Sequence, residues 1–112
     1  MNITVTVIDG VSGRAANGVE LTVVGELAGE QTSHTDGFTD TEGKFTYSPE
    51  KERLVRGEFY AMELNVDEYY ASMGMMAGYT KVTILVRVMD MQANYRISTL
   101  ITPFSHAIWS VR

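Results

Sequence analysis

A strict alternation of side chains opens the chain and constrains its fold more than any other feature. Residues 3–8 read Ile-Thr-Val-Thr-Val-Ile, so an extended backbone would place the apolar and the hydroxyl-bearing members of the run on opposite faces. A period of two in β-branched residues is typical of a strand with one buried face. Similar short segments recur along the chain, separated by turn residues such as Asn17-Gly18. The pattern predicts a domain of short strands.

We expect about eight strands and one short helix, which together form an all-β sandwich in a single domain over residues 1–112. After the first strand, the clearest strand segments are residues 19–24, 58–64, 81–89, 94–102 and 104–111. A tight turn with Gly43 at positive φ is expected between two short strands. Asn65 is expected to cap a helix that ends at Gly74 and that two tyrosines, Tyr69 and Tyr70, anchor to the sheet.

The composition excludes several classes of partner. A net charge of −5 with no run of basic residues disfavours nucleic acid, because nothing offsets the repulsion from phosphates. There is no cysteine, hence no disulfide framework and no thiolate metal site. No apolar run approaches the length of a bilayer, and the chain starts directly in a strand without a basic and apolar leader. We therefore expect a cytoplasmic protein that binds neither nucleic acid nor membrane.

Isolated residues of possible function have simpler interpretations. His34 and His106 lie far apart and lack the spacing of a metal-binding pair, so we interpret each as a surface or pocket residue and predict no metal and no cofactor. The glycines of residues 10–18 are interpreted as turn residues, because a phosphate-binding loop requires a following helix. Two interpretations exist for the methionines of residues 73–76: an adaptable apolar binding surface or a helix end packed on the sandwich, which we favour.

The last two expected strands carry the most suggestive pattern. Arg96 and Ser98 alternate onto one face of the first, and Trp109 lies on the corresponding face of the second. An arginine is unusual on a purely apolar face, because a buried guanidinium must be paired or bound to something. Two hypotheses remain open at this point: a ligand-binding arginine, or a structural one paired with a glutamate at a subunit interface.

Several segments, in the same order and spacing, resemble the transthyretin and 5-hydroxyisourate hydrolase family. The strand Thr4–Asp9, the stretch of residues 13–19 and the Thr-Asp-Thr-Glu-Gly-Lys turn of residues 39–44 are similar to its opening motifs. Residues 94–105 resemble, without a gap, the hydrolase segment His-Tyr-His-x-Pro-Leu-Leu-Leu-Ser-Pro-Tyr-Gly. Residues 109–112 stand where the hydrolase ends in Tyr-Arg-Gly-Ser. The resemblance spans essentially the whole chain.

The resemblance implies a homotetramer, a dimer of dimers, in which each subunit has two four-stranded sheets and edge strands pair between subunits. In the hydrolase, a central channel holds the active site that opens a urate-derived ring by attack of water. Where the hydrolase has its two histidines, its arginine and its terminal serine, this chain has Thr6, Arg96, Lys44 and Arg112. Neither threonine nor a protonated arginine can take a proton from water near pH 7, so efficient hydrolysis of 5-hydroxyisourate is not expected.

We therefore predict a repurposed enzyme of small-molecule biosynthesis whose cationic and aromatic channel holds an anionic or aromatic substrate. Lys44 and Arg96 are the expected catalytic residues, because fixed positive charge stabilises developing anions. The expected substrate-binding residues are Thr6, Ser98, Trp109 and Arg112. The reaction is a cyclisation, tautomerisation or hydrolysis. The alternatives are a noncatalytic carrier of a small ligand, a structural sandwich module, and a 5-hydroxyisourate hydrolase of purine breakdown that uses other groups as bases.

Overall fold

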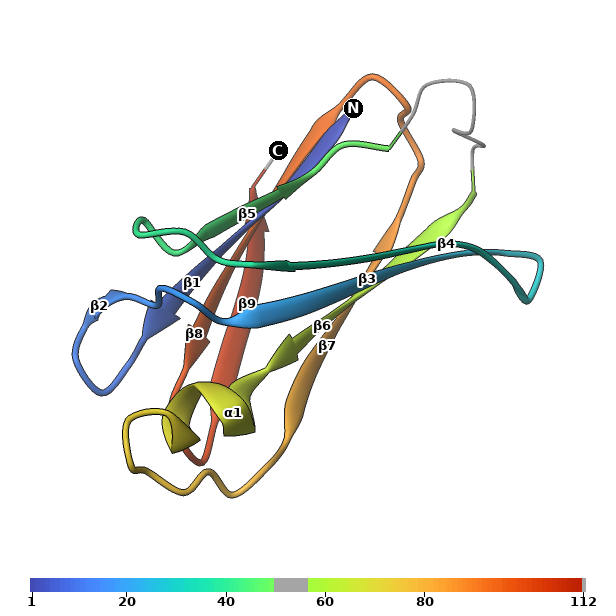
Figure 1. Cartoon of the computed structure of the whole chain (residues 1–112). Coiled ribbons are helices and arrows are strands. Elements are labelled where there is room, and N and C mark those ends of the chain that lie inside the picture. Colours follow the sequence, from blue (N-terminus) through green and yellow to red (C-terminus); the bar gives the residue numbers. More distant parts are fainter. Residues whose placement is uncertain (50–56, 112) are drawn as a thin grey trace.

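The computed structural model describes residues 1–49 and 57–111, which form two packed β-sheets with one short helix (Figure 1). In chain order the elements are β1 (Asn2–Asp9), β2 (Arg14–Ala15), β3 (Glu20–Leu27), β4 (Glu30–Phe38), β5 (Lys44–Tyr47), β6 (Phe59–Asn65), α1 (Val66–Ala71), β7 (Lys81–Arg87), β8 (Asn94–Ile101) and β9 (His106–Val111). The expected all-β sandwich with one short helix is confirmed.

The first sheet has the strand order β2-β1-β8-β9, and β5 also pairs with β1. Strands β1 and β8 run parallel, whereas the other pairs are antiparallel. Strand β5 borders Ile3–Thr6 of β1, and β2 borders only Ile8 and Asp9. This sheet therefore has five strands among the described residues, not the four that the resemblance implied, because the glycine-rich turn region contains a two-residue ladder of its own.

The second sheet has the order β4-β3-β6-β7 and is antiparallel throughout. The core lies between the sheets, and alternate residues of each strand supply it. On β1 the odd-numbered Ile3, Val5 and Val7 are fully buried, and on β3 Leu21 and Val23 face them from the other sheet. Burial of one such side chain contributes about 1.5–3 kcal/mol. The period-two pattern of the sequence is thus the inward face of each strand.

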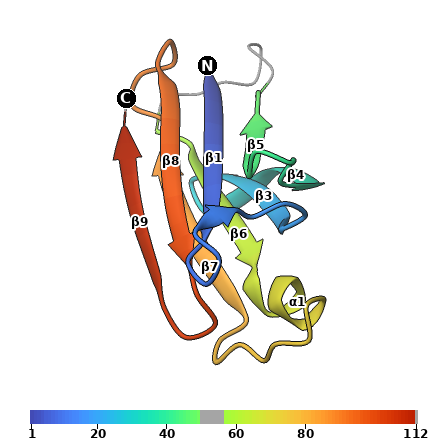
Figure 2. The same cartoon turned by 90° about the vertical axis from the view of Figure 1, so that its left-hand side faces the viewer.

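Helix α1 covers one end of the sandwich (Figures 1 and 2). The Asn65 side chain accepts a hydrogen bond from the Glu68 backbone N–H at 3.2 Å, as expected for an N-cap. Gly74 has φ of 75°, which ends the helical turn. The hydroxyls of Tyr69 and Tyr70 both donate to the Asp9 carboxylate at the end of β1. The predicted cap and tyrosine anchor are confirmed. The helix itself ends at Ala71, with Ser72 as its C-cap, earlier than the predicted stop at Gly74.

The methionines after this helix do not pack on the sandwich as we had favoured. Met73, Met75 and Met76 are 49%, 37% and 85% exposed. The loop is held instead by Tyr79, whose hydroxyl lies 2.9 Å from the carbonyls of Thr102 and Ser105. The methionines of this loop thus lie at the surface. No helix of the described part of the chain is long and apolar enough to cross a membrane.

Candidate functional site

Four of the predicted site residues form one row across the outer face of the first sheet. In the strand register, Lys44 of β5 lies opposite Thr6 of β1, Thr6 opposite Ser98 of β8, and Ser98 opposite Trp109 of β9. Figure 2 shows these strands side by side in the order β9, β8, β1, β5. Neighbouring strands are about 4.8 Å apart, so the row is about 14 Å long. It joins a cation, two hydroxyls and an indole.

Arg96 belongs to the next row of the same face, between Thr4 of β1 and Val111 of β9. It is exposed and forms no ion pair with any residue in the ranges that the structure describes. Arg96 thus places an exposed guanidinium two positions from Ser98 on β8. Arg112, the remaining predicted binding residue, lies outside the described residues.

The turn before β5 fixes where Lys44 enters this row. The Asp40 carboxylate accepts backbone hydrogen bonds from Glu42 at 2.8 Å and from Lys44 at 3.0 Å. Gly43 has φ of 74°, and a Cβ there would lie 2.5 Å from the Val7 carbonyl oxygen. A glycine is therefore required both by the backbone conformation and by the close approach to β1. The predicted tight turn with Gly43 at positive φ is confirmed.

The ammonium group of Lys44 is accessible. Its Nζ lies 3.6 Å from Oε2 of Glu42, and the two side chains are 50% and 74% exposed. An ion pair this open to water is worth about 1 kcal/mol or less. Lys44 can thus exchange Glu42 for an anionic ligand at small cost.

An apolar pocket of about 350 Å³ opens between β7 and the β8–β9 pair. Arg96 and Trp109 both line it, together with Ile84, Val86 and Ile108. None of the other row members lines this pocket. The structure therefore brings the predicted residues together in two overlapping places: the row on the outer sheet face, and a pocket at the sheet edge that only the arginine and the tryptophan reach.

The sequence analysis did not identify two buried carboxylates. Asp9 and Glu58 are each 3% exposed, and each accepts hydrogen bonds from tyrosine hydroxyls. Burial, with Asp9 as the hydrogen-bond acceptor, raises the pKa of Tyr69 to about 12. The alternation of inward and outward residues along each strand predicts that both carboxylates point inward. Asp9 follows the inward Val7 by two residues, and Glu58 precedes the inward Tyr60 by two.

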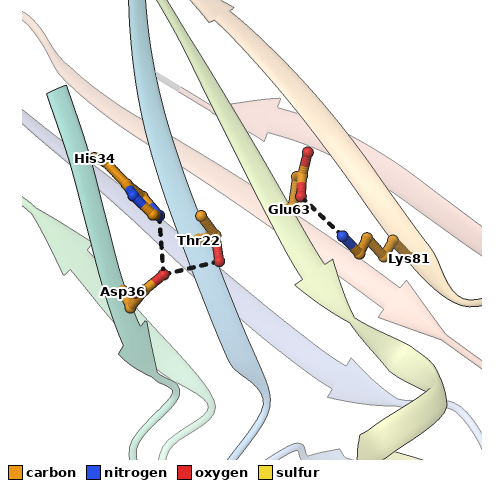
Figure 3. A network of polar contacts seen from close by, with 5 residues as sticks. All are labelled: Thr22, His34, Asp36, Glu63 and Lys81. Carbon is orange, nitrogen blue, oxygen red and sulfur yellow. Dashed lines mark hydrogen bonds and ion pairs between the residues drawn. The ribbon is translucent and has the colours of Figure 1, made fainter. Parts of the chain in front are cut away.

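The outer face of the second sheet carries small polar networks (Figure 3). Asp36 accepts a hydrogen bond from the Thr22 hydroxyl at 3.0 Å and lies 3.3 Å from Nε2 of His34. Lys81 Nζ lies 3.3 Å from Oε2 of Glu63 on the neighbouring strand. Within residues 1–49 and 57–111, no group of three or more histidine and acidic side chains is placed to hold a metal ion. These are surface networks, and His34 lies at the surface as expected.

Comparisons with known proteins agree with the architecture. The family model described as the HIUase/Transthyretin family matches residues 3–110. A crystal structure of transthyretin from Sparus aurata is similar, with a TM-score of 0.84 and 23% identity over 97% of this chain and 95% of that chain. Sea bream transthyretin in complex with thyroxine gives the same TM-score and identity, over 97% and 93% of the two chains. No curated protein matches.

Proposed function

This chain belongs to the HIUase/Transthyretin family, and we propose that it is a homotetramer that binds and converts a small anionic or aromatic molecule. The proposed site is the outer face of the first sheet, where symmetry-related copies would enclose a channel. The whole chain acts as one domain, in the cytoplasm, where a protein without cysteine needs no oxidising environment. The family relation supports the assembly, and the chemistry rests on the residues of this chain.

The observation that carries the proposal is the row from Lys44 through Thr6 and Ser98 to Trp109. Trp109 is 46% exposed, which is unusual for an indole that serves only the core. An indole face stacks on planar ligands, and the ammonium of Lys44 and the guanidinium of Arg96 form charge-assisted hydrogen bonds to anions. The combination suits a planar molecule that carries a carboxylate, phenolate or enolate.

The edges of the two sheets support association between copies. Strands β7 and β9 are the edge strands on one side of the sandwich. Leu85 of β7 and Ile108 of β9 are 68% and 40% exposed. An edge strand with exposed apolar side chains is a template for pairing with another chain. We assign these edges to the dimer contact, which leaves the outer face of the first sheet for the channel.

In the proposed reaction, Lys44 and Arg96 stabilise negative charge that develops on the bound molecule. The hydroxyls of Thr6 and Ser98 both donate and accept, so they orient a ligand oxygen between the two cations. A cyclisation, tautomerisation or hydrolysis of an acidic substrate would use the same charge stabilisation.

Two other functions share this face. A noncatalytic carrier is favoured by the similar fold of the sea bream transthyretin that binds thyroxine. A 5-hydroxyisourate hydrolase is the other function in the family's description. Thr6 and Arg96 provide no general base for that hydrolysis, so we expect turnover of 5-hydroxyisourate to be negligible. A rate close to that of an authentic hydrolase would show that other groups serve as bases.

The single tryptophan of the chain reports directly on ligand binding. Planar carboxylates and phenols should quench Trp109 fluorescence in a saturable manner. Arg96→Ala should weaken binding by about 1.5–3 kcal/mol, the size of a hydrogen bond to a charged group, while the control Arg14→Ala on β2 of the same sheet leaves it unchanged. Chromatography of the incubated ligand separates an enzyme from a carrier. Light scattering that gives a monomer at micromolar concentration would overturn the channel, and so would an Arg96→Ala tetramer with unchanged affinity.

A further inference from the structure

A second pocket, polar and about 550 Å³ in volume, opens at the opposite side of the sandwich, between β4 and β5. His34 and Pro49 form its walls together with six residues that carry a hydroxyl: Thr32, Ser33, Thr35, Tyr47, Ser48 and Tyr60. The inner face of a sandwich edge is ordinarily apolar. The hydroxyls at this position favour a polar occupant. The charge of a buried side chain next to the pocket indicates which charge that occupant carries.

That group is the carboxylate of Glu58, which is 3% exposed. It accepts hydrogen bonds from the Thr32 hydroxyl and, at 2.9 Å, from the Tyr60 hydroxyl. No cationic side chain within residues 1–49 and 57–111 forms an ion pair with it. A buried carboxylate without a counter-charge is costly. The polar pocket thus lies next to a buried negative charge that has no cationic partner among the described residues.

Glu58 also determines what the wall can offer to an occupant. Thr32 and Tyr60 give their only hydroxyl protons to the carboxylate, so their remaining lone pairs are left to face the pocket. The rings of Tyr47 and Tyr60 lie 5.3 Å apart at 57°, and aromatic faces attract cations. Burial and the hydrogen bond to Glu58 raise the pKa of Tyr60, so its hydroxyl keeps its proton and its orientation.

We propose that this pocket binds the ammonium group of a small primary amine. A primary ammonium brings three N–H donors and one positive charge, which match the oxygen lone pairs of the wall and the buried carboxylate behind it. A carboxylate would be repelled, and an alcohol would gain hydrogen bonds but no charge attraction. The site is independent of the row on the outer face of the first sheet, because none of its lining residues belongs to that row.

The test uses the full chain and three probes of similar size: butylammonium chloride, butanol and sodium butyrate. Two-dimensional amide NMR of deuterated protein should show saturable shifts at Thr32–Thr35, Tyr47 and Tyr60 with butylammonium alone. Glu58→Gln removes the negative charge behind the wall and should weaken that binding by at least about tenfold. Glu63→Gln is the matched control: it removes the same charge from the outer face of β6 (Figure 3) and should leave binding unchanged.

Three results would contradict binding of an ammonium group in this pocket. Equal shifts with butanol, an unchanged affinity in Glu58→Gln, or no saturable shift at the pocket would each overturn it. If Glu58→Gln does not fold, Thr32→Val keeps the shape of the β-branched side chain and removes one acceptor from the wall. Thr32→Val should then bind butylammonium severalfold more weakly, and undiminished binding would contradict the proposal.

Discussion

The chain buries two carboxylates, Asp9 and Glu58, and their surroundings differ in an instructive way. Asp9 receives three donors: the hydroxyls of Tyr69 and Tyr70 at 2.9 and 2.8 Å, and the Val11 backbone N–H at 2.9 Å. These donors come from α1 and from the turn after β1, so the carboxylate joins the helix to the sheet. Hydrogen bonds from N–H and O–H donors stabilise the negative charge of this carboxylate.

Within residues 1–49 and 57–111, Glu58 receives two hydroxyl donors, and the residues that carry them, Thr32 and Tyr60, line the polar pocket. Neither of the two pockets described above is lined by Asp9 or by its tyrosines. The same chemical group is therefore a structural junction in one place and a source of negative potential next to a pocket in the other. The two roles differ in one respect: the residues that donate to Glu58 line a pocket, and the tyrosines that donate to Asp9 do not.

The largest effect should come from Asp9→Ala. This change removes the acceptor of the Val11 N–H and the Tyr69 hydroxyl, at about 1–3 kcal/mol for each unsatisfied group, and it detaches α1 from β1. The Tyr70 hydroxyl also loses this acceptor but keeps the Ile101 carbonyl at 3.0 Å. We expect the free energy of unfolding to fall by about 3–5 kcal/mol. Urea unfolding followed by circular dichroism at a fixed protein concentration measures it.

The control is Asp36→Ala, which also removes a carboxylate that accepts a threonine hydroxyl. The Asp36 side chain is 67% exposed, so its donors can turn to water and the loss should stay below about 1 kcal/mol. Similar losses for Asp9→Ala and Asp36→Ala would contradict the view that Asp9 is the structural junction.

A second, smaller effect concerns alkaline pH. Burial and the Asp9 carboxylate raise the pKa of Tyr69 to about 12 and that of Tyr70 further, whereas a tyrosine of the unfolded chain has a pKa of about 10. The unfolded state therefore loses these protons first. Their contribution to stability is complete below pH 10 and is lost as the pH rises toward 12 and beyond, by at most about 1.4 kcal/mol per pH unit for each tyrosine.

The variant Tyr69→Phe tests whether Tyr69 causes this loss of stability at alkaline pH. The variant keeps the ring against Tyr70 but has no phenol to ionise. Stability measured by urea unfolding at several pH values between 9 and 12 should fall less steeply for Tyr69→Phe than for the parent chain. An identical slope in the two proteins would place the alkaline sensitivity elsewhere than at the Asp9 cluster.

Local features of this fold were predictable from the sequence, and nonlocal ones were not. The Asn65 cap and the positive φ of Gly43 depend on residues within one turn, so the sequence predicted both correctly. The two-residue β2 was missed, because two residues carry no periodicity. The exposure of Met76 was also missed, because the burial of a loop side chain depends on tertiary packing that no local pattern encodes.

The local features of the candidate site were likewise predictable from the sequence, and the nonlocal ones were not. Parity alone grouped Ser98 with Trp109, and the register confirms that they are direct neighbours. Parity cannot give the register between strands far apart in the sequence, so the alignment of Lys44 with Thr6 rested on resemblance. Glu58 was detectable as an inward residue of its strand. The identity of its partner Thr32, 26 residues away in sequence, depends on the registers that pair β4 with β3 and β3 with β6.

The smallest effect on stability should come from Glu58→Ala. This variant tests the comparison between Asp9 and Glu58 most directly. The change frees the hydroxyls of Thr32 and Tyr60, but both border the polar pocket, so they can turn their protons to water there. It also removes a buried charge that has no cationic partner among the described residues, which offsets part of the lost hydrogen bonding. We therefore expect a loss of only about 1–2 kcal/mol in urea unfolding, well below that of Asp9→Ala. Equal losses for the two alanine variants would mean that Glu58 is as enclosed as Asp9, and the contrast between a structural and a pocket-facing carboxylate would then fail.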